Sequence, residues 1–262
     1  MCHTILLLAG DLFHPLRKVG QGGGINGCIF LCEGQGGTWE MTWRAVFAFV
    51  LVVLIAASIG MAVAAGERSP VFLQEPSARA FLFKVVLMLV AYAGAIVTIV
   101  ANCGDEWDLE MRNAALFGTI AGVVEGLNVA LANGFAPPIQ NPPVHLAGIL
   151  VVFTLWAVAA GRTARELGHF NAGVIAAVMS AGVCMVIGVT VGFAMELFIA
   201  PPLPGHVATW AEFKRSGWTD AQAFGIANTL HSGFAHLWMG PVIALLVGSL
   251  GAAIGQRLTE KR

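Results

Sequence analysis

Six apolar stretches, separated by short polar or proline-containing segments, make up most of the chain after Trp43. Each is long enough to cross the roughly 30 Å hydrocarbon core of a bilayer as a helix, which takes about 20 residues. A helix is required because lipid offers no hydrogen-bond partner to an unpaired backbone group. The sequence therefore predicts an all-α, polytopic bundle of about six transmembrane helices, at about 44–66, 80–102, 112–133, 144–164, 171–198 and 232–256.

The segment between the fifth and sixth spans, residues 199–231, is predicted to contain a short helix of its own. Thr219-Asp220-Ala221-Gln222 has the form of a capping box, in which Thr219 would be the N-cap. We expect this helix to run to Leu230 and to end before the last span begins.

Residues 1–40 differ from the rest of the chain and carry glycine clusters at 21–24 and 34–37 without sustained periodicity. They are predicted to be disordered or to be a misassigned leader, because Met41 and the residues after it resemble a natural chain start. Residues 41–262 would then form a single transmembrane domain. The span at 44–66 also resembles a cleaved signal peptide, although its length favours an uncleaved anchor.

Composition supports the membrane class and excludes others. Hydrophobic residues are 57% of the chain, charged residues are 11% and the mean hydropathy is +0.79, so the bilayer is the expected partner. A net charge of −1 without a basic tract argues against a nucleic-acid partner. Cys28 and Cys32 lack a second ligand pair, so neither a metal site nor a cofactor is predicted.

The distribution of Lys and Arg predicts the orientation, because short cytoplasmic loops carry the excess of positive charge. Six spans place both termini on one side, and that side holds nine basic residues against four on the other. We therefore expect a multi-pass protein of the cell membrane with both termini in the cytoplasm. The nine are Arg17, Lys18, Arg44, Arg112, Arg162, Arg165, Arg257, Lys261 and Arg262, and the four are Arg68, Arg79, Lys214 and Arg215.

Small residues at intervals of four predict close helix packing in the third and sixth spans. Helices in lipid approach closely where Gly and Ala form a continuous ridge. The packing candidates are Gly118, Gly122 and Gly126 in the third span and Gly240 and Gly248 in the sixth. Such ridges fit contact with other helices of this chain, with a partner subunit or with a second copy.

Glu125 is the most informative residue, because it lies within an otherwise uncharged apolar run. A carboxylate at that depth costs several kcal/mol unless it is paired, protonated or hydrated. On a helical wheel it projects near Gly118 and Gly122, towards a neighbouring helix and away from lipid. Asn128 is expected to donate a hydrogen bond to it, and Lys84 is the predicted ion-pair partner. Glu196, His145 and His236 are the other polar candidates, all in the outer half of the membrane.

The leading hypothesis is a transporter or channel-like protein for an unidentified small solute or ion, with an outward-facing polar cavity around Glu125. The alternative is a structural or accessory subunit of a membrane complex, in which Glu125 only specifies helix pairing. A redox subunit with b-type haem between His145 and His236 is a more distant alternative. The chain contains no metalloprotease, nucleophile-elbow or phosphate-loop motif, so no catalytic residue is predicted.

Overall fold

The computed structural model describes residues 43–69, 71–102, 107–134, 142–199, 201 and 204–260. The prediction for residues 1–40 lies outside this range. Within it the chain is helical, without strands, and six helices are long and apolar enough to cross a membrane. The predicted all-α membrane bundle is therefore confirmed.

The six long helices are α2 (Trp43–Glu67), α3 (Pro76–Asn102), α4 (Asp108–Gly134), α5 (Pro142–Leu167), α6 (Phe170–Ala194) and α9 (Ala221–Glu260). Within the described residues, four short elements connect or extend them: a 3-10 turn, Phe72–Gln74; a π-helical turn, Met195–Ile199; α7, Pro204–Val207; and α8, Ala211–Ser216. Most long helices begin or end a few residues beyond the predicted spans, because hydropathy marks the lipid core and not the helix ends.

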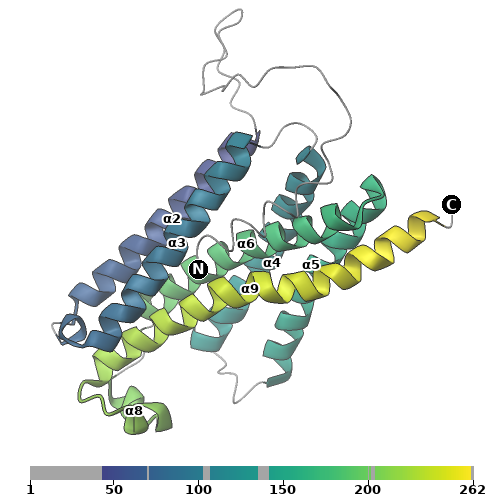
Figure 1. Ribbon diagram of the computed structural model, residues 1–262. Coiled ribbons are helices and arrows are strands. Elements are labelled where there is room, and N and C mark those ends of the chain that lie inside the picture. The colour runs from purple at the N-terminus through teal and green to yellow at the C-terminus, as the bar shows by residue number, and fades with distance from the viewer. Residues whose placement is uncertain are drawn as a thin grey trace, which may run out of the picture. The chain divides into compact units, whose positions relative to one another are not determined.

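Helix α6 forms the centre of the bundle. It packs against α2, α4, α5 and α9, whereas α3 lies at the edge and packs against α2 and α9 (Figure 1). More of α6 is buried than of any other membrane-length helix in the described part of the chain. The outer helices expose large apolar side chains, among them Phe49, Phe83 and Leu246, as expected for surfaces in contact with lipid.

The two ends of the bundle are marked by contacts between helix termini. At one end the Arg68 guanidinium donates to the carbonyl oxygen of Leu197 at 3.2 Å, which joins the end of α2 to the π-helical turn. We call this the loop end, because α7 and α8 lie here. At the other end, the terminal end, Trp43 contacts Asp108 and Thr259 donates to the carbonyl oxygen of Arg165. The first and last described residues therefore share one end, as six crossings require.

Helix α9 is continuous for 40 residues, so the predicted separation of a short helix ending at Leu230 from the last span is wrong. The N-cap also differs: Asp220, not Thr219, accepts the backbone N–H of Ala223, at 2.7 Å. The helix continues because Leu230 and Leu237 are fully buried on either side of the expected break. Gly233 between them packs closely against the Phe193 ring of α6.

Pro241 lies inside α9 and cannot donate the backbone hydrogen bond that the Leu237 carbonyl would receive in an uninterrupted helix. The hydroxyl of Tyr92, on α3, donates to that carbonyl oxygen at 2.6 Å. Tyr92 is the only tyrosine in the chain. It therefore replaces a bond that the proline removes and ties α3 to α9 at this level of the membrane.

The glycines of the predicted ridges lie at helix contacts. A Cβ added at Gly118 would lie 2.6 Å from the carbonyl oxygen of Ser180, and one at Gly122 would lie 2.8 Å from Cβ of Ile187, so α4 and α6 approach closely there. In α9, an added Cβ at Gly248 would lie 2.5 Å from Cβ of Ala177, again on α6. Gly126 and Gly240 face Val191 and Met185 of α6 in the same way.

Candidate functional site

A polar cavity of about 40 Å³ lies between α4, α6 and α9, near the loop end. Its polar side chains come from three elements: Glu125 from α4, Glu196 from the π-helical turn, and Thr229, Ser232 and His236 from α9. The rest of the lining is apolar or glycine: Val129, Met185, Gly188, Val189, Gly192, Phe193 and Gly233. Glycines of α6 leave the space that side chains of α4 enter, because Gly188 faces Glu125 and Gly192 faces Val129.

Glu125 lies buried at this cavity, with 9% of its surface exposed. Its Cγ is opposite Gly188 of α6, where an added Cβ would lie 3.1 Å away. One carboxylate oxygen is 3.9 Å from Nε2 of His236, an imidazole that is about half exposed. The pair therefore connects a buried carboxylate to a more exposed titratable group.

The hydrogen bonding of His236 determines which of its nitrogens faces Glu125. Nδ1 lies 2.8 Å from the carbonyl oxygen of Ser232, and because a carbonyl only accepts, Nδ1 carries the proton of that bond. Nε2 is then the nitrogen that faces the Glu125 carboxyl group. At 3.9 Å the two groups are close enough for an ion pair if His236 is protonated, but they are too far apart for a direct hydrogen bond.

Glu196 reaches the same cavity from the π-helical turn Met195–Ile199, which follows directly on α6. Its Oε2 accepts a hydrogen bond from the Thr229 hydroxyl at 2.7 Å. The Arg68 guanidinium holds this turn by donating to the Leu197 carbonyl and by lying 4.2 Å from the ring centroid of Phe198. Single π-helical turns of this kind occur often at functional sites, because they reorient a side chain relative to the helix before them.

Asn128 and His145 form a separate pair. The Asn128 amide oxygen accepts a hydrogen bond from Nδ1 of His145 at 2.7 Å, which joins α4 to α5. Neither residue is among those that line the polar cavity. The predicted bond from Asn128 to Glu125 is not the one formed, because Asn128 faces α5 while Glu125 faces α6 and α9.

Lys84 also lies away from the cavity. It is exposed on α3, with its ammonium 5.5 Å from the ring centroid of Phe81. Helix α3 packs against α2 and α9, whereas Glu125 is on α4, so the predicted Lys84–Glu125 ion pair is not formed. The structure thus brings together three of the predicted polar residues, Glu125, Glu196 and His236, and places Asn128, His145 and Lys84 elsewhere.

Thr229 and Ser232 were not predicted to belong to the site. From the sequence, Thr229 is expected near the end of a short surface helix and Ser232 at the start of a span, and neither position indicates a function. The spacing Thr229, Ser232, Gly233 and His236 is nevertheless that of one helical face. It would have identified them if α9 had been expected to be continuous.

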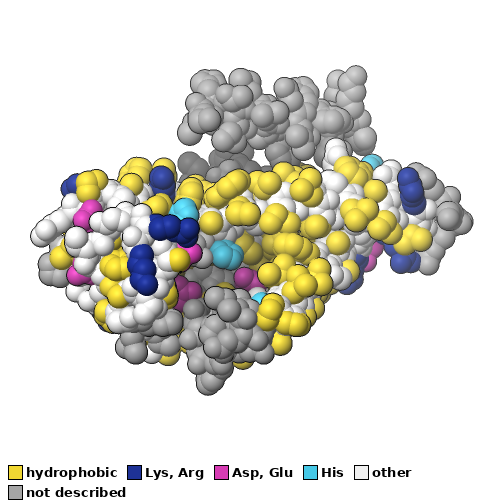
Figure 2. All heavy atoms as spheres, turned by 90° about the horizontal axis from the view of Figure 1, so that it is seen from below, with side chains coloured by type: hydrophobic (Ala, Val, Ile, Leu, Met, Phe, Trp, Pro, Cys, Tyr) yellow, Lys and Arg dark blue, Asp and Glu magenta, His cyan; other side chains and the backbone are white. Residues whose placement is uncertain are grey.

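The size and surroundings of the cavity limit what it can hold. One water molecule needs roughly 10–15 Å³ of such a cavity, so about 40 Å³ holds a few water molecules. Pockets for organic ligands begin at about 300 Å³. Figure 2 shows histidine and acidic side chains around a hollow on one face, with an apolar surface on one side of it and Lys and Arg side chains on the other. The arrangement suits water, a proton or a small ion more than an organic solute.

These features define an integral membrane protein of the polytopic helical class with a buried acidic site. No family model, no curated protein and no solved structure matches the chain.

Proposed function

We propose that this protein moves protons, or an equally small monovalent cation, through the cavity formed by Glu125, Glu196 and His236. The observation that carries the proposal is their convergence: three titratable side chains from three elements line one small cavity between membrane helices. Chains of Asp, Glu and His inside a membrane bundle are typical of proton relays.

Each residue has a distinct role in this proposal. Glu196, at the end of α6 and nearer the loop end, receives the ion first, and Thr229 holds its carboxylate in place. His236 passes a proton to Glu125 across the 3.9 Å gap through one water. Glu125 is the deepest of these groups in the bundle and controls the transfer of the proton to the next group on the route.

A buried hydroxyl lies in the direction in which the ion would continue. Ser180 is on α6, eight residues from Gly188 towards the terminal end, or about 12 Å by helix rise. Its Oγ is fully buried and has no hydrogen-bond partner within the described part of the chain. An ordered water molecule is expected beside such an atom, so Ser180 is the next polar group on the proposed route.

The distribution of basic residues indicates the orientation of the protein in the membrane. The terminal end carries the larger number of Lys and Arg residues, so we place it in the cytoplasm and the loop end outside. The cavity would then take up its ion from the outer side of a cell membrane.

The test is proton uptake by proteoliposomes that contain a pH-sensitive dye, driven by a potassium diffusion potential. Glu125→Gln is expected to lower the rate at least about tenfold, because the neutral amide cannot exchange a proton and each 1.4 kcal/mol of lost stabilisation is one decade. Glu166→Gln is the matched control. That carboxylate is exposed at the terminal end of α5 and pairs with Arg162, so its loss should leave the rate unchanged.

Two results would count against the proposal. Equal rates for wild type and Glu125→Gln, with both variants folded, would remove Glu125 from the route. A wild-type rate no greater than that of empty vesicles, with loss of an assembly when Glu125 is replaced, would favour the alternative function of a structural subunit.

A further inference from the structure

A second and larger cavity also borders α6, at the terminal end of the bundle. Its volume is about 310 Å³. It is bounded by α2 and α3 on one side and by α4 and α6 on the other, because α3 packs against α2 and α9 and leaves this space beside α4. Its walls are almost entirely apolar, with Phe47, Leu51, Ile96 and Val178 among them.

The cavity is about as deep as one leaflet of a bilayer. Along α3 its lining extends from Val100 to Met88, which is about 18 Å at 1.5 Å per residue. Half of the hydrocarbon core measures roughly 15 Å. The one tyrosine hydroxyl in the lining, that of Tyr92, already donates to Leu237, so it has no proton left for a ligand. The interior therefore suits a hydrocarbon chain and not a polar molecule.

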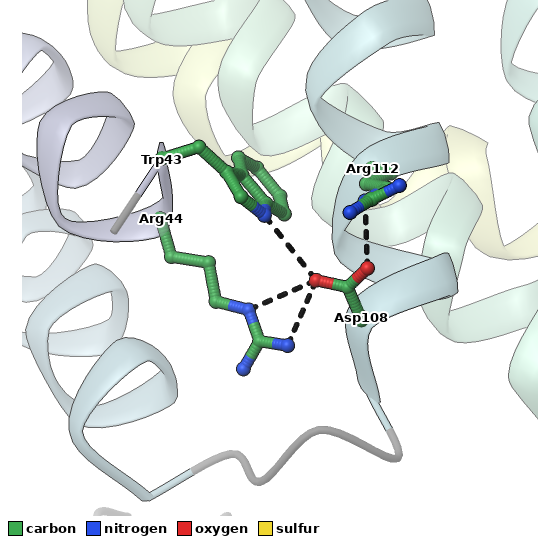
Figure 3. Close-up of polar contacts among 4 residues, drawn as sticks. All are labelled: Trp43, Arg44, Asp108 and Arg112. Atoms are coloured by element: carbon green, nitrogen blue, oxygen red, sulfur yellow. Dashed lines mark hydrogen bonds and ion pairs between the residues drawn. The ribbon is translucent and has the colours of Figure 1, made fainter. Parts of the chain in front are cut away.

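The mouth of the cavity, in contrast, carries charged side chains. Trp43 and Arg44 line it, and Arg44 donates through Nε and Nη2 to one oxygen of Asp108 at 3.1 and 2.8 Å (Figure 3). Nε of Arg112 lies 2.6 Å from the other oxygen of Asp108, and its guanidinium lies 5.9 Å from the Trp43 ring centroid. Two guanidinium groups share the Asp108 carboxylate, and a second carboxylate, Glu110, is buried two residues further along α4.

Arg112 lies beside this mouth, next to Trp43, although it is not itself part of the lining. Its side chain is 65% exposed, although Asp108 holds its Nε. A guanidinium presents several donors in a planar fork that matches a phosphate group. The Trp43 indole beside it is of the kind found at the level of lipid headgroups.

We propose that this cavity is a lipid-binding site, in which one acyl chain of an anionic phospholipid from the terminal-end leaflet occupies the apolar space and its phosphate contacts Arg112. The volume, the one-leaflet depth and the exposed guanidinium beside the mouth agree on this occupant. The site is separate from the polar cavity, and the proposal does not depend on proton movement.

The experiment uses the full-length protein in vesicles of phosphatidylcholine with a minority of phosphatidylglycerol. A photoreactive diazirine on the acyl chain is carried either by the phosphatidylglycerol or, in a parallel sample, by phosphatidylcholine, and labelled peptides are identified by mass spectrometry. Label is expected on the segments that contain Ile96 and Val178, with about a fivefold preference for phosphatidylglycerol, the effect of one basic residue at a membrane surface. Arg112→Gln should abolish that preference while the protein remains folded.

A pair of variants on α3 separates the cavity from the general lipid surface. Ala95→Phe places a ring in the cavity and should reduce labelling of the Val178 segment several-fold. Val97→Phe is the matched control, because Val97 is 55% exposed and is not part of the lining, so labelling should not change. Equal labelling in the two variants, or equal labelling by the two lipids in the wild type, would overturn the proposal. Absence of label from the lining would also overturn it and would indicate another occupant, such as residues 1–40 or a second copy of the chain.

Discussion

Removal of the Tyr92 hydroxyl by Tyr92→Phe should destabilise the bundle by an amount that depends on Pro241. The hydroxyl is the donor to the Leu237 carbonyl at 2.6 Å, and the proline has no N–H to take its place. Leaving a buried carbonyl unpaired costs roughly 1–3 kcal/mol in proteins generally. Interhelical hydrogen bonds measured in membranes contribute less, about 0.6 kcal/mol on average with a maximum near 1.7. We therefore expect a loss of about 1 kcal/mol, or roughly a fivefold change in the unfolding equilibrium.

The same substitution in a Pro241→Ala background should cost much less. The introduced alanine would restore a backbone N–H four residues after Leu237, and that carbonyl would be paired within α9 whether or not Tyr92 has its hydroxyl. The free energy of unfolding is measured by titration with sodium dodecyl sulfate in mixed micelles, followed by far-ultraviolet circular dichroism. The four proteins of this double-mutant cycle should show a coupling of about 0.5–1 kcal/mol between the two positions. An equal cost of Tyr92→Phe in both backgrounds would refute the role assigned to the hydroxyl.

Three further predictions concern packing and the limits of the site. Gly118→Ala should destabilise the protein by about 1–3 kcal/mol, because the new methyl group would meet the Ser180 carbonyl. Gly94→Ala on α3, where nothing lies within 4 Å of an added Cβ, should be neutral or slightly stabilising in the same titration. Asn128→Leu should lower the free energy of unfolding by about 1 kcal/mol through the lost hydrogen bond to His145, and should leave the initial rate of proton uptake unchanged. A rate as low as that of Glu125→Gln would place Asn128 in the site after all. Ser180→Ala should leave the free energy of unfolding unchanged or raise it, since the hydroxyl makes no hydrogen bond within the described residues. The same substitution should slow proton uptake. An unaltered rate of uptake would end the proposed route before this residue.

The six membrane helices could be predicted from the sequence because bilayer-length hydropathy is a local property. The burial of Glu125 could also be anticipated from its position on the helical wheel, next to the glycines that face α6. Both inferences need only the sequence of a single helix.

The partners of Glu125 could not be predicted in the same way, because they depend on which helices are neighbours. Lys84 is the partner that depth alone predicts, yet α3 packs against α2 and α9, and His236 of α9 takes that place. The sequence predicts His236 itself at the start of a span. Only the burial of Leu230 and Leu237 makes α9 continuous and brings Thr229, Ser232 and His236 onto one face. The hydrogen bond between Asn128 and His145 likewise depends on the contact between α4 and α5.

The central claim is that Glu125 exchanges protons with water in the cavity although it is buried. Infrared spectroscopy of the protein in lipid vesicles tests this directly, with the carboxyl bands of Glu125 identified by their loss in Glu125→Gln. We predict that these bands change with bulk pH and that the protonated form shifts within minutes of transfer to deuterated water. Bands that neither respond to pH nor shift in deuterated water would contradict the account, because Glu125 would then be a dry packing group without access to the proposed route.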